Sequence, residues 1–123
     1  MDKKSILLVE DDQDLSRLTA MALRANNYKV VHAQDAVTAV TKAQKEEPDL
    51  ILLDIGIPGG DGFLVMNRLQ LTPSLSKVPV VVISARDPSV NKERALMTGA
   101  RAYFQKPADN DELLTKISEL LAA

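Results

Sequence analysis

The stretch from Pro48 to Gly62, PDLILLDIGIPGGDG, decides the expected fold. Its continuous apolar run from Leu50 to Leu53 is closed by turn residues, which is typical of a short strand buried on both faces. The run ends at Asp54, and ligands of open α/β sheets bind at the carboxyl ends of the strands. An aspartate at this place also suits a plain turn. This stretch alone leaves a chemical role and a turn-forming role for Asp54 equally open.

The rest of the chain alternates between short apolar runs and segments with helical periodicity. Four further strands are predicted at residues 5–9, 29–33, 78–83 and 102–105. Five helices are predicted from Asp12 or Asp14 to about Asn26, from Asp35 to Pro48, from Phe63 to before Pro73, from Asp87 to Thr98, and from Asp109 or Asn110 onward. The expected inner stripes are Leu15, Leu18, Ala22 and Ala25 in the first helix and Ala36, Val37, Ala39, Val40 and Ala43 in the second.

Strands that alternate with helices predict an α/β fold, here a five-stranded parallel sheet with helices on both faces. Right-handed crossovers bring the carboxyl ends of all parallel strands to one edge of the sheet. Polar residues that follow different strands should therefore meet at that edge. They are Glu10, Asp11, Asp54, Ser84 and Lys106.

Length and composition limit the class of protein. The 123 residues suit one domain, expected to span 1–123, and a hydrophobic fraction of 46% is typical of globular chains. The net charge of −2, with dispersed basic residues, does not favour nucleic-acid binding. The absence of cysteine excludes disulfides and thiolate chemistry. Because no apolar run is long enough for a signal peptide or a membrane span, we expect a cytoplasmic protein.

The polar groups expected at this edge favour phosphoryl transfer. Crowded carboxylates repel one another, and a divalent cation relieves that repulsion. A ligand set made of oxygen atoms alone favours Mg²⁺. Lys106 would add a fixed positive charge and Ser84 a hydroxyl donor, and such groups neutralise a phosphoryl group in transfer. Asp54 would be the nucleophile that becomes an acyl phosphate.

Four segments of the chain resemble the response-regulator receiver domain of two-component signalling. They are Leu7–Asp12, Leu52–Gly62, Val81–Ala85 and Gly99–Pro107. Each segment contains the end of a predicted strand, and the resemblance extends over nearly the whole chain. It implies a doubly wound, flavodoxin-like fold with the strand order 2-1-3-4-5 and five helices.

The resemblance also implies which residues accept the phosphoryl group and hold the metal. Asp54 would be phosphorylated, Asp11 would bind Mg²⁺ directly, and Glu10 would bind it mainly through water. Asp54 and the main-chain carbonyl of Gly56 would complete the protein ligands. The position of Gly56 is also one that tunes the rates of phosphorylation and dephosphorylation. Because glycine has no side chain, nothing at this position blocks the approach of water to the site.

Further residues have implied roles in phosphoryl binding and in switching. Ser84 and Lys106 would each contact a phosphoryl oxygen, and the bond from Lys106 to Pro107 would be cis. Tyr103 would be the aromatic switch, whose ring turns inward when Ser84 moves toward the phosphoryl group. Arg86 would influence the reaction rates.

The resulting hypothesis is a phosphoacceptor switch of a phosphorelay. It is not an enzyme in the usual sense, but it assists its own phosphoryl transfer and autodephosphorylation. The implied partners are a sensor histidine kinase or a histidine phosphotransfer protein, and a downstream protein target. A phosphorylation-dependent homodimer is a further option, and neither nucleic acid nor a membrane is expected as a direct partner.

Two alternatives stay open. One is a receiver-like interaction module that phosphorylation does not control, against which the intact set of site residues argues. The other is a Mg²⁺-dependent phosphatase with an aspartyl-phosphate intermediate. Such enzymes usually carry a second acid two residues after the nucleophile, where this chain has Gly56. His32, the only histidine, lies on an outer strand without evident partners and is expected to be structural.

Overall fold

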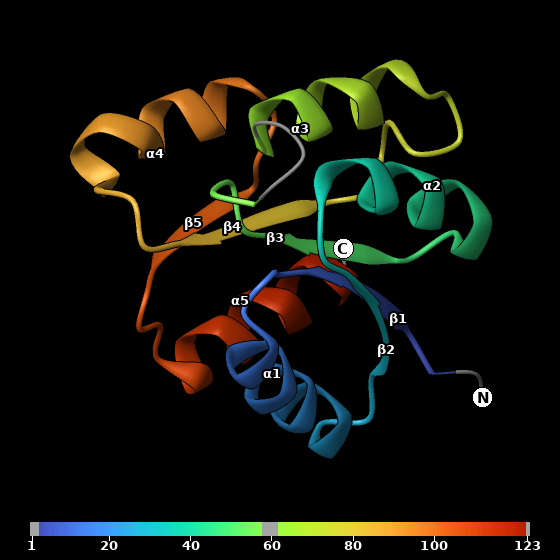
Figure 1. Ribbon diagram of the computed structural model, residues 1–123. Helices are drawn as coiled ribbons and strands as arrows, with labels where there is room; N and C mark the ends of the chain where they lie inside the picture. The colour runs from blue at the N-terminus through green and yellow to red at the C-terminus, as the bar shows by residue number, and fades with distance from the viewer. Residues whose placement is uncertain (1–2, 58–61, 123) are drawn as a thin grey trace.

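The computed structural model describes residues 3–57 and 62–122 (Figure 1). Within these residues, the strands are β1 (Ser5–Val9), β2 (Lys29–Ala33), β3 (Leu50–Leu53), β4 (Val80–Ser84) and β5 (Ala102–Gln105). The helices are α1 (Gln13–Ala25), α2 (Ala36–Glu46), α3 (Gly62–Leu71), α4 (Pro88–Met97) and α5 (Asn110–Ala122). None of the helices in the described part of the chain is long and apolar enough to cross a membrane.

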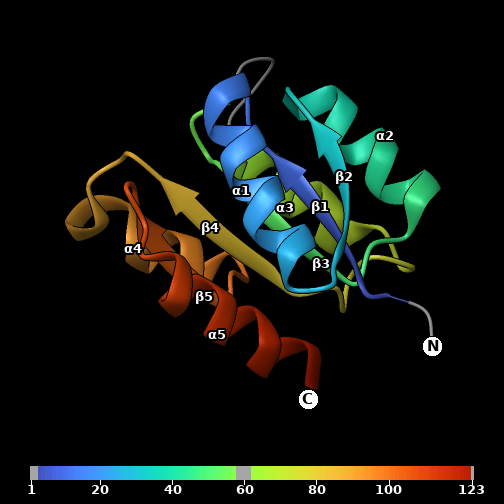
Figure 2. The same ribbon diagram turned by 90° about the horizontal axis from the view of Figure 1, so that it is seen from below.

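The strands form one parallel sheet in the order β2-β1-β3-β4-β5. Helices α1 and α5 cover one face of the sheet, and α2, α3 and α4 cover the other (Figures 1 and 2). The predicted α/β class, the strand order and the five helices are therefore confirmed.

The strands divide their side chains between two apolar layers. In β1, Ile6 and Leu8 pack with α1 and α5, whereas Leu7 and Val9 pack on the opposite side. Successive side chains of a strand point to opposite faces, so a strand covered on both faces has to be apolar throughout. The same layers continue through β3 and β4, and they hold the strand ends that carry the polar residues.

Four helices of the described chain begin at an aspartate cap. Asp12, Asp35, Asp87 and Asp109 each accept a backbone N–H two or three residues later, at 3.1, 2.8, 2.9 and 3.0 Å. These caps satisfy N–H groups that have no acceptor inside the helix, and they confirm the predicted starts. The fourth strand begins at residue 80, two residues later than predicted.

The predicted inner stripe of the first helix is partly wrong. Helix α1 buries Ser16, Ala20 and Leu23, whereas Leu18 is 64% exposed. Both sets recur at helical spacing, and the small Ser16 and Ala20 let the helix pack closely on the sheet. The other predicted stripe residues that lie in exposed positions are Ala25 in α1 and Val37 in α2.

At two positions the backbone requires glycine, one because of a close approach and one because of a positive φ angle. A Cβ at Gly62 would lie 2.4 Å from Ile55 Cα, so α3 can begin against the segment after β3 only with glycine there. Gly99 has a φ of +115° and ends α4 in a conformation that other residues avoid, as predicted. Part of the turn-forming segment that follows Asp54, residues 58–61, lies outside the described residues.

Candidate functional site

The polar residues predicted to share one edge of the sheet do lie together. Strand pairing brings the strand ends side by side: the N–H of Asp54 donates to Val9 O at 3.0 Å, and the N–H of Lys106 donates to Ser84 O at 2.8 Å. The set comprises Glu10 and Asp11 after β1, Asp54 after β3, Ser84 at the end of β4 and Lys106 after β5.

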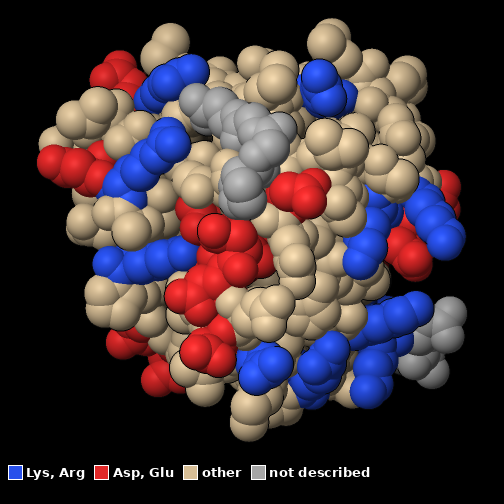
Figure 3. Space-filling view, in the orientation of Figure 1, with Lys and Arg blue, Asp and Glu red and all other residues tan. Residues whose placement is uncertain are grey.

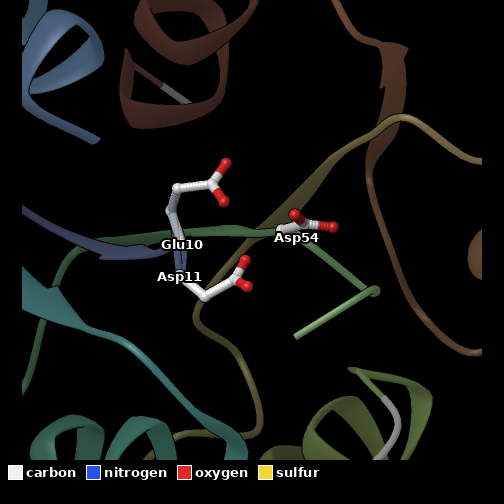
Figure 4. A group of neighbouring side chains, drawn as sticks. All are labelled: Glu10, Asp11 and Asp54. Carbon is white, nitrogen blue, oxygen red and sulfur yellow. The ribbon is translucent and has the colours of Figure 1, made fainter. Parts of the chain in front are cut away.

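Three carboxylates form the centre of this edge. Glu10, Asp11 and Asp54 each offer an oxygen, and these oxygens all lie within 4.8 Å of one another (Figure 4). Glu10 and Asp54 are only 5% and 7% exposed, while Asp11 is exposed. Acidic side chains gather in the middle of the face that Figure 3 shows. The site thus concentrates negative charge that is partly withdrawn from water.

Lys106 balances part of that charge. Its Nζ donates to Asp54 Oδ2 at 2.8 Å and to Glu10 Oε1 at 2.5 Å. Burial by itself lowers the pKa of Lys106, but the hydrogen bonds to Asp54 and Glu10 and their charges outweigh it and raise the pKa. The ammonium therefore stays charged at neutral pH. The peptide bond from Lys106 to Pro107 is cis, as the resemblance implied.

Glu10 has a second hydrogen bond within the site. Its Oε2 accepts the N–H of Asp12 at 3.2 Å, which ties the side chain to the first turn of α1. Burial raises the pKa of Glu10, and the neighbouring charge of Asp54 acts in the same direction. The contacts with Lys106 and Asp12 oppose this rise without cancelling it. One ammonium is therefore shared between two carboxylates, and the crowding predicted from the sequence is real.

The turn after β3 shapes the other side of Asp54. The N–H of Gly56 donates to Asp54 Oδ1 at 2.8 Å. A Cβ at Gly56 would lie 3.4 Å from Asp54 Oδ1 and 3.9 Å from Arg86 Nε. The space beside the carboxylate is thus open at Gly56, and the guanidinium of Arg86 borders it.

Ser84 and Tyr103 are linked through the loop after β4. The N–H of Arg86 donates to Ser84 Oγ at 3.1 Å, and the Tyr103 hydroxyl donates to Arg86 O at 2.8 Å. The Tyr103 side chain is buried, and this burial raises the pKa of its hydroxyl. The two residues predicted to act together in switching are therefore in one hydrogen-bonded unit.

One pair near this site was missed in the sequence. Ser16 Oγ and His32 Nδ1 are 2.9 Å apart, so His32 is not without a partner, although the expected structural role fits this contact. The signal that could have found it is the helical spacing of Ser16 with Ala20 and Leu23, which turns Ser16 toward the sheet. The two side chains line a 290 Å³ pocket that also contacts Glu10.

Comparison with known proteins identifies the family. The sequence model of the response regulator receiver domain matches residues 6–118. The chain belongs to the receiver domain family of response regulators. Receiver domains belong to two-component systems and are in general phosphoacceptor switches rather than classical enzymes.

Relatives of this receiver domain include short and long proteins. The chain is 35% identical over 118 residues to the protein PilH of Pseudomonas aeruginosa, covering 95% of the chain and 97% of PilH. It is 37% identical over 115 residues to the response regulator PleD of Caulobacter vibrioides, covering 94% of the chain but only 25% of PleD. The chain thus spans a small part of some relatives and nearly all of others.

A solved receiver domain has the same fold and contains a metal. The structure of the receiver domain of the sensor histidine kinase PA1611 from Pseudomonas aeruginosa matches with a TM-score of 0.91 and 26% identity, covering 98% of this chain and 99% of that one. A magnesium ion is coordinated in the active site cleft of that protein.

The carboxylates of the present receiver domain fit a magnesium ion. Mg²⁺ binds oxygen at about 2.1 Å, so two ligands on opposite sides of one ion are about 4.2 Å apart. The oxygens of Glu10, Asp11 and Asp54 lie within 4.8 Å of one another, which is close to that spacing. All three donors are hard oxygens, the ligands that Mg²⁺ prefers. The cluster could therefore hold this metal.

Proposed function

We propose that this chain is a phosphoacceptor switch of a phosphorelay, with Asp54 as the phosphorylated residue. The observation that carries the proposal is the double contact of Lys106 Nζ with Asp54 Oδ2 and Glu10 Oε1 beside the exposed Asp11. Through it, the carboxylate that we propose as the nucleophile, a fixed cation and the acidic group that we propose as the metal site lie within a few ångströms of one another. The family membership supports the same chemistry.

The proposed transfer uses Asp54 as the nucleophile. A carboxylate oxygen of Asp54 attacks the phosphorus of a phosphohistidine in the partner, and the P–N bond breaks. The bonding electron pair stays with the imidazole, which takes up a proton, and Asp54 becomes an aspartyl phosphate. In autodephosphorylation, water attacks the phosphorus, the P–O bond to Asp54 breaks, and inorganic phosphate leaves.

Side chains around Asp54 would position the group and neutralise its charge. The ammonium of Lys106 would contact one phosphoryl oxygen and neutralise part of its charge. Ser84 would donate a hydrogen bond from its hydroxyl to another phosphoryl oxygen. Arg86 borders the open space at Gly56, so we propose that these two positions influence how fast the group is gained and lost.

Magnesium would be held by Asp11 and Asp54, by the carbonyl of Gly56, and by Glu10 mainly through water. When bound, Mg²⁺ supplies positive charge that offsets the negative charge of the phosphoryl oxygens. Lys106 would then be released from part of its present contacts to the carboxylates.

The proposed signal is a change in the populations of two conformations near β4 and β5. Ser84, Arg86 and Tyr103 are already joined by hydrogen bonds, so a movement of the Ser84 hydroxyl toward a phosphoryl group would break the contact with the Arg86 N–H. Helix α4 follows this loop directly, and its Arg94 lies 3.8 Å above the ring of Phe63 in α3. The loop therefore connects the site with an outer helix.

The proposed partners follow from this chemistry. A sensor histidine kinase or a histidine phosphotransfer protein would supply the phosphoryl group, and a downstream protein would bind the altered surface. A phosphorylation-dependent homodimer and a cytoplasmic location belong to the same proposal.

Acetyl phosphate with Mg²⁺ tests the phosphoacceptor. Mass spectrometry should show one added phosphoryl group, absent from Asp54→Asn and present in the control Asp14→Asn, whose carboxylate is an exposed one on α1. Equal labelling of Asp54→Asn would overturn the assignment of Asp54. No labelling of the wild type, together with no spectral response to Mg²⁺, would instead favour an interaction module that phosphorylation does not control.

A further inference from the structure

A second polar pocket lies at the opposite end of the strands. It has a volume of 600 Å³ and is formed where β1 and β2 begin and α1 ends. Lys3, Arg24 and Lys29 contribute three cations to its lining, and Glu46 contributes the one carboxylate. The amino ends of parallel strands lie at the edge opposite their carboxyl ends, so this pocket is remote from Asp54.

The cations of this pocket form no ion pair within the described chain, although Asp49 Oδ2 accepts the N–H of the lining residue Ser5 at 2.7 Å. None of Lys3, Arg24 and Lys29 takes part in an ion pair among residues 3–57 and 62–122. Figure 3 shows Lys and Arg side chains gathered at the lower right, apart from the central acidic group. The chain as a whole has a net charge of −2. The excess of positive charge is therefore local to this part of the surface.

The walls of the pocket are held by the backbone. The N–H of Lys29 donates to Lys4 O at 2.9 Å, and the N–H of Tyr28 donates to Leu23 O at 3.1 Å. The half-buried Tyr28 and Val30 pack against the core beneath α1 and α5 and form the apolar part of the lining. The pocket is therefore preformed, and binding would require ordering only the cationic side chains.

We propose that this pocket binds the phosphate group of a small anionic ligand. Its volume lies in the range of small-molecule sites, and its donors are ammonium and guanidinium groups with the Ser5 hydroxyl beside them. Arginine and lysine form charge-assisted hydrogen bonds with phosphate oxygens, and arginine can form two at once. The carboxylate of Glu46, which also lines the pocket, disfavours anions that approach from its side. This site is independent of the phosphoacceptor function.

Inorganic pyrophosphate without divalent cations is the probe. We expect two-dimensional NMR of the full chain to show saturable shifts of the amides of Tyr28, Lys29 and Val30, with a dissociation constant at or below about 1 mM. The double variant Arg24→Gln/Lys29→Gln should weaken binding at least about tenfold. The control Lys77→Gln/Lys92→Gln removes the same charge elsewhere and should leave binding unchanged.

Three results would overturn the proposal. They are no saturable shift at these amides, equal binding by both double variants, and shifts confined to the surroundings of Lys106. An unchanged melting temperature of the variants shows that a loss of binding is not a loss of folding. Sedimentation with phosphatidylglycerol vesicles distinguishes two sources of the phosphate group. If the wild type cosediments with the vesicles and the Arg24→Gln/Lys29→Gln variant does not, the group belongs to a lipid headgroup. If the wild type binds pyrophosphate but does not cosediment, the group belongs to a free ligand.

Discussion

Lys106 Nζ donates a hydrogen bond to Asp54 Oδ2 at 2.8 Å, although the two residues are 52 positions apart in the chain. The same ammonium contacts Glu10, and the side chains of all three are largely buried. Water and salt screen such charges less than they screen surface pairs. The stability of the domain and the chemistry proposed for its site therefore depend on the same lysine.

Replacing Lys106 with glutamine should destabilise the fold at neutral pH. The variant leaves Glu10 and Asp54 facing each other without a cation, so the free energy of unfolding should fall by about 1–3 kcal/mol. The loss should shrink toward about pH 5, because protonation of a carboxyl removes the repulsion. Denaturant unfolding at both pH values measures this. Lys116→Gln, which removes an exposed pair with Glu119, should cost less than about 0.5 kcal/mol. A loss for Lys106→Gln that is the same at both pH values would contradict the explanation.

Magnesium should stabilise the folded domain through Asp11. At a Mg²⁺ concentration ten times the dissociation constant, the expected gain in the free energy of unfolding is about 1.4 kcal/mol. Asp11→Asn should lose most of this gain and be at least as stable as the wild type without metal, because Asp11 is exposed and its charge adds to the repulsion among the three carboxylates. Thermal melts with and without MgCl₂ test this, and Asp14→Asn is the matched control. If Asp11→Asn kept the full gain, the metal would have to bind elsewhere.

Two glycines close to the site should respond differently to alanine. Gly62→Ala places a Cβ 2.4 Å from Ile55 Cα, and the backbone shift required should cost about 3 kcal/mol. Gly56→Ala meets Asp54 Oδ1 at an ordinary 3.4 Å, so it should fold normally and change only the rates of phosphoryl gain and loss. Unfolding curves and acetyl-phosphate labelling separate the two effects. Equal stability of both variants would show that the start of α3 can move.

His32 should make stability depend on pH. Burial lowers the pKa of His32, and the charges of Arg24 and Lys42 lower it further. The unfolded chain has the ordinary pKa of about 6.5 and binds the proton first as pH falls. The free energy of unfolding should therefore decrease as pH falls through about 6.5, and this component should level off below the folded pKa. His32→Gln should lack the component. A stability difference between the two proteins that does not vary with pH would refute this account.

The sequence predicted the residues at the site more accurately than the buried faces of the helices. Asp54, Ser84 and Lys106 were placed correctly because each follows a strand, and parallel topology leaves their backbones one common edge. The inner face of α1 was mispredicted because Leu18 fits a helical stripe as well as Ala20 does, and only packing distinguishes the two. The contact of Ser16 with His32 also could not be read from either residue alone, since a strand and a helix have to be docked before the side chains meet.

The sequence by itself determined the order of strands and helices, their caps, and the gathering of acidic groups at one edge, because periodicity, capping and the direction of parallel strands are local or topological properties. Only the tertiary structure decided that Lys106 is shared between Glu10 and Asp54 and that the Tyr103 hydroxyl contacts Arg86. It also decided that cations without an ion pair among the described residues collect at the other end of the sheet. Those features depend on the distances between side chains from distant segments of the chain and on how deeply these side chains are buried. Electrostatic energies change with both the distance and the burial.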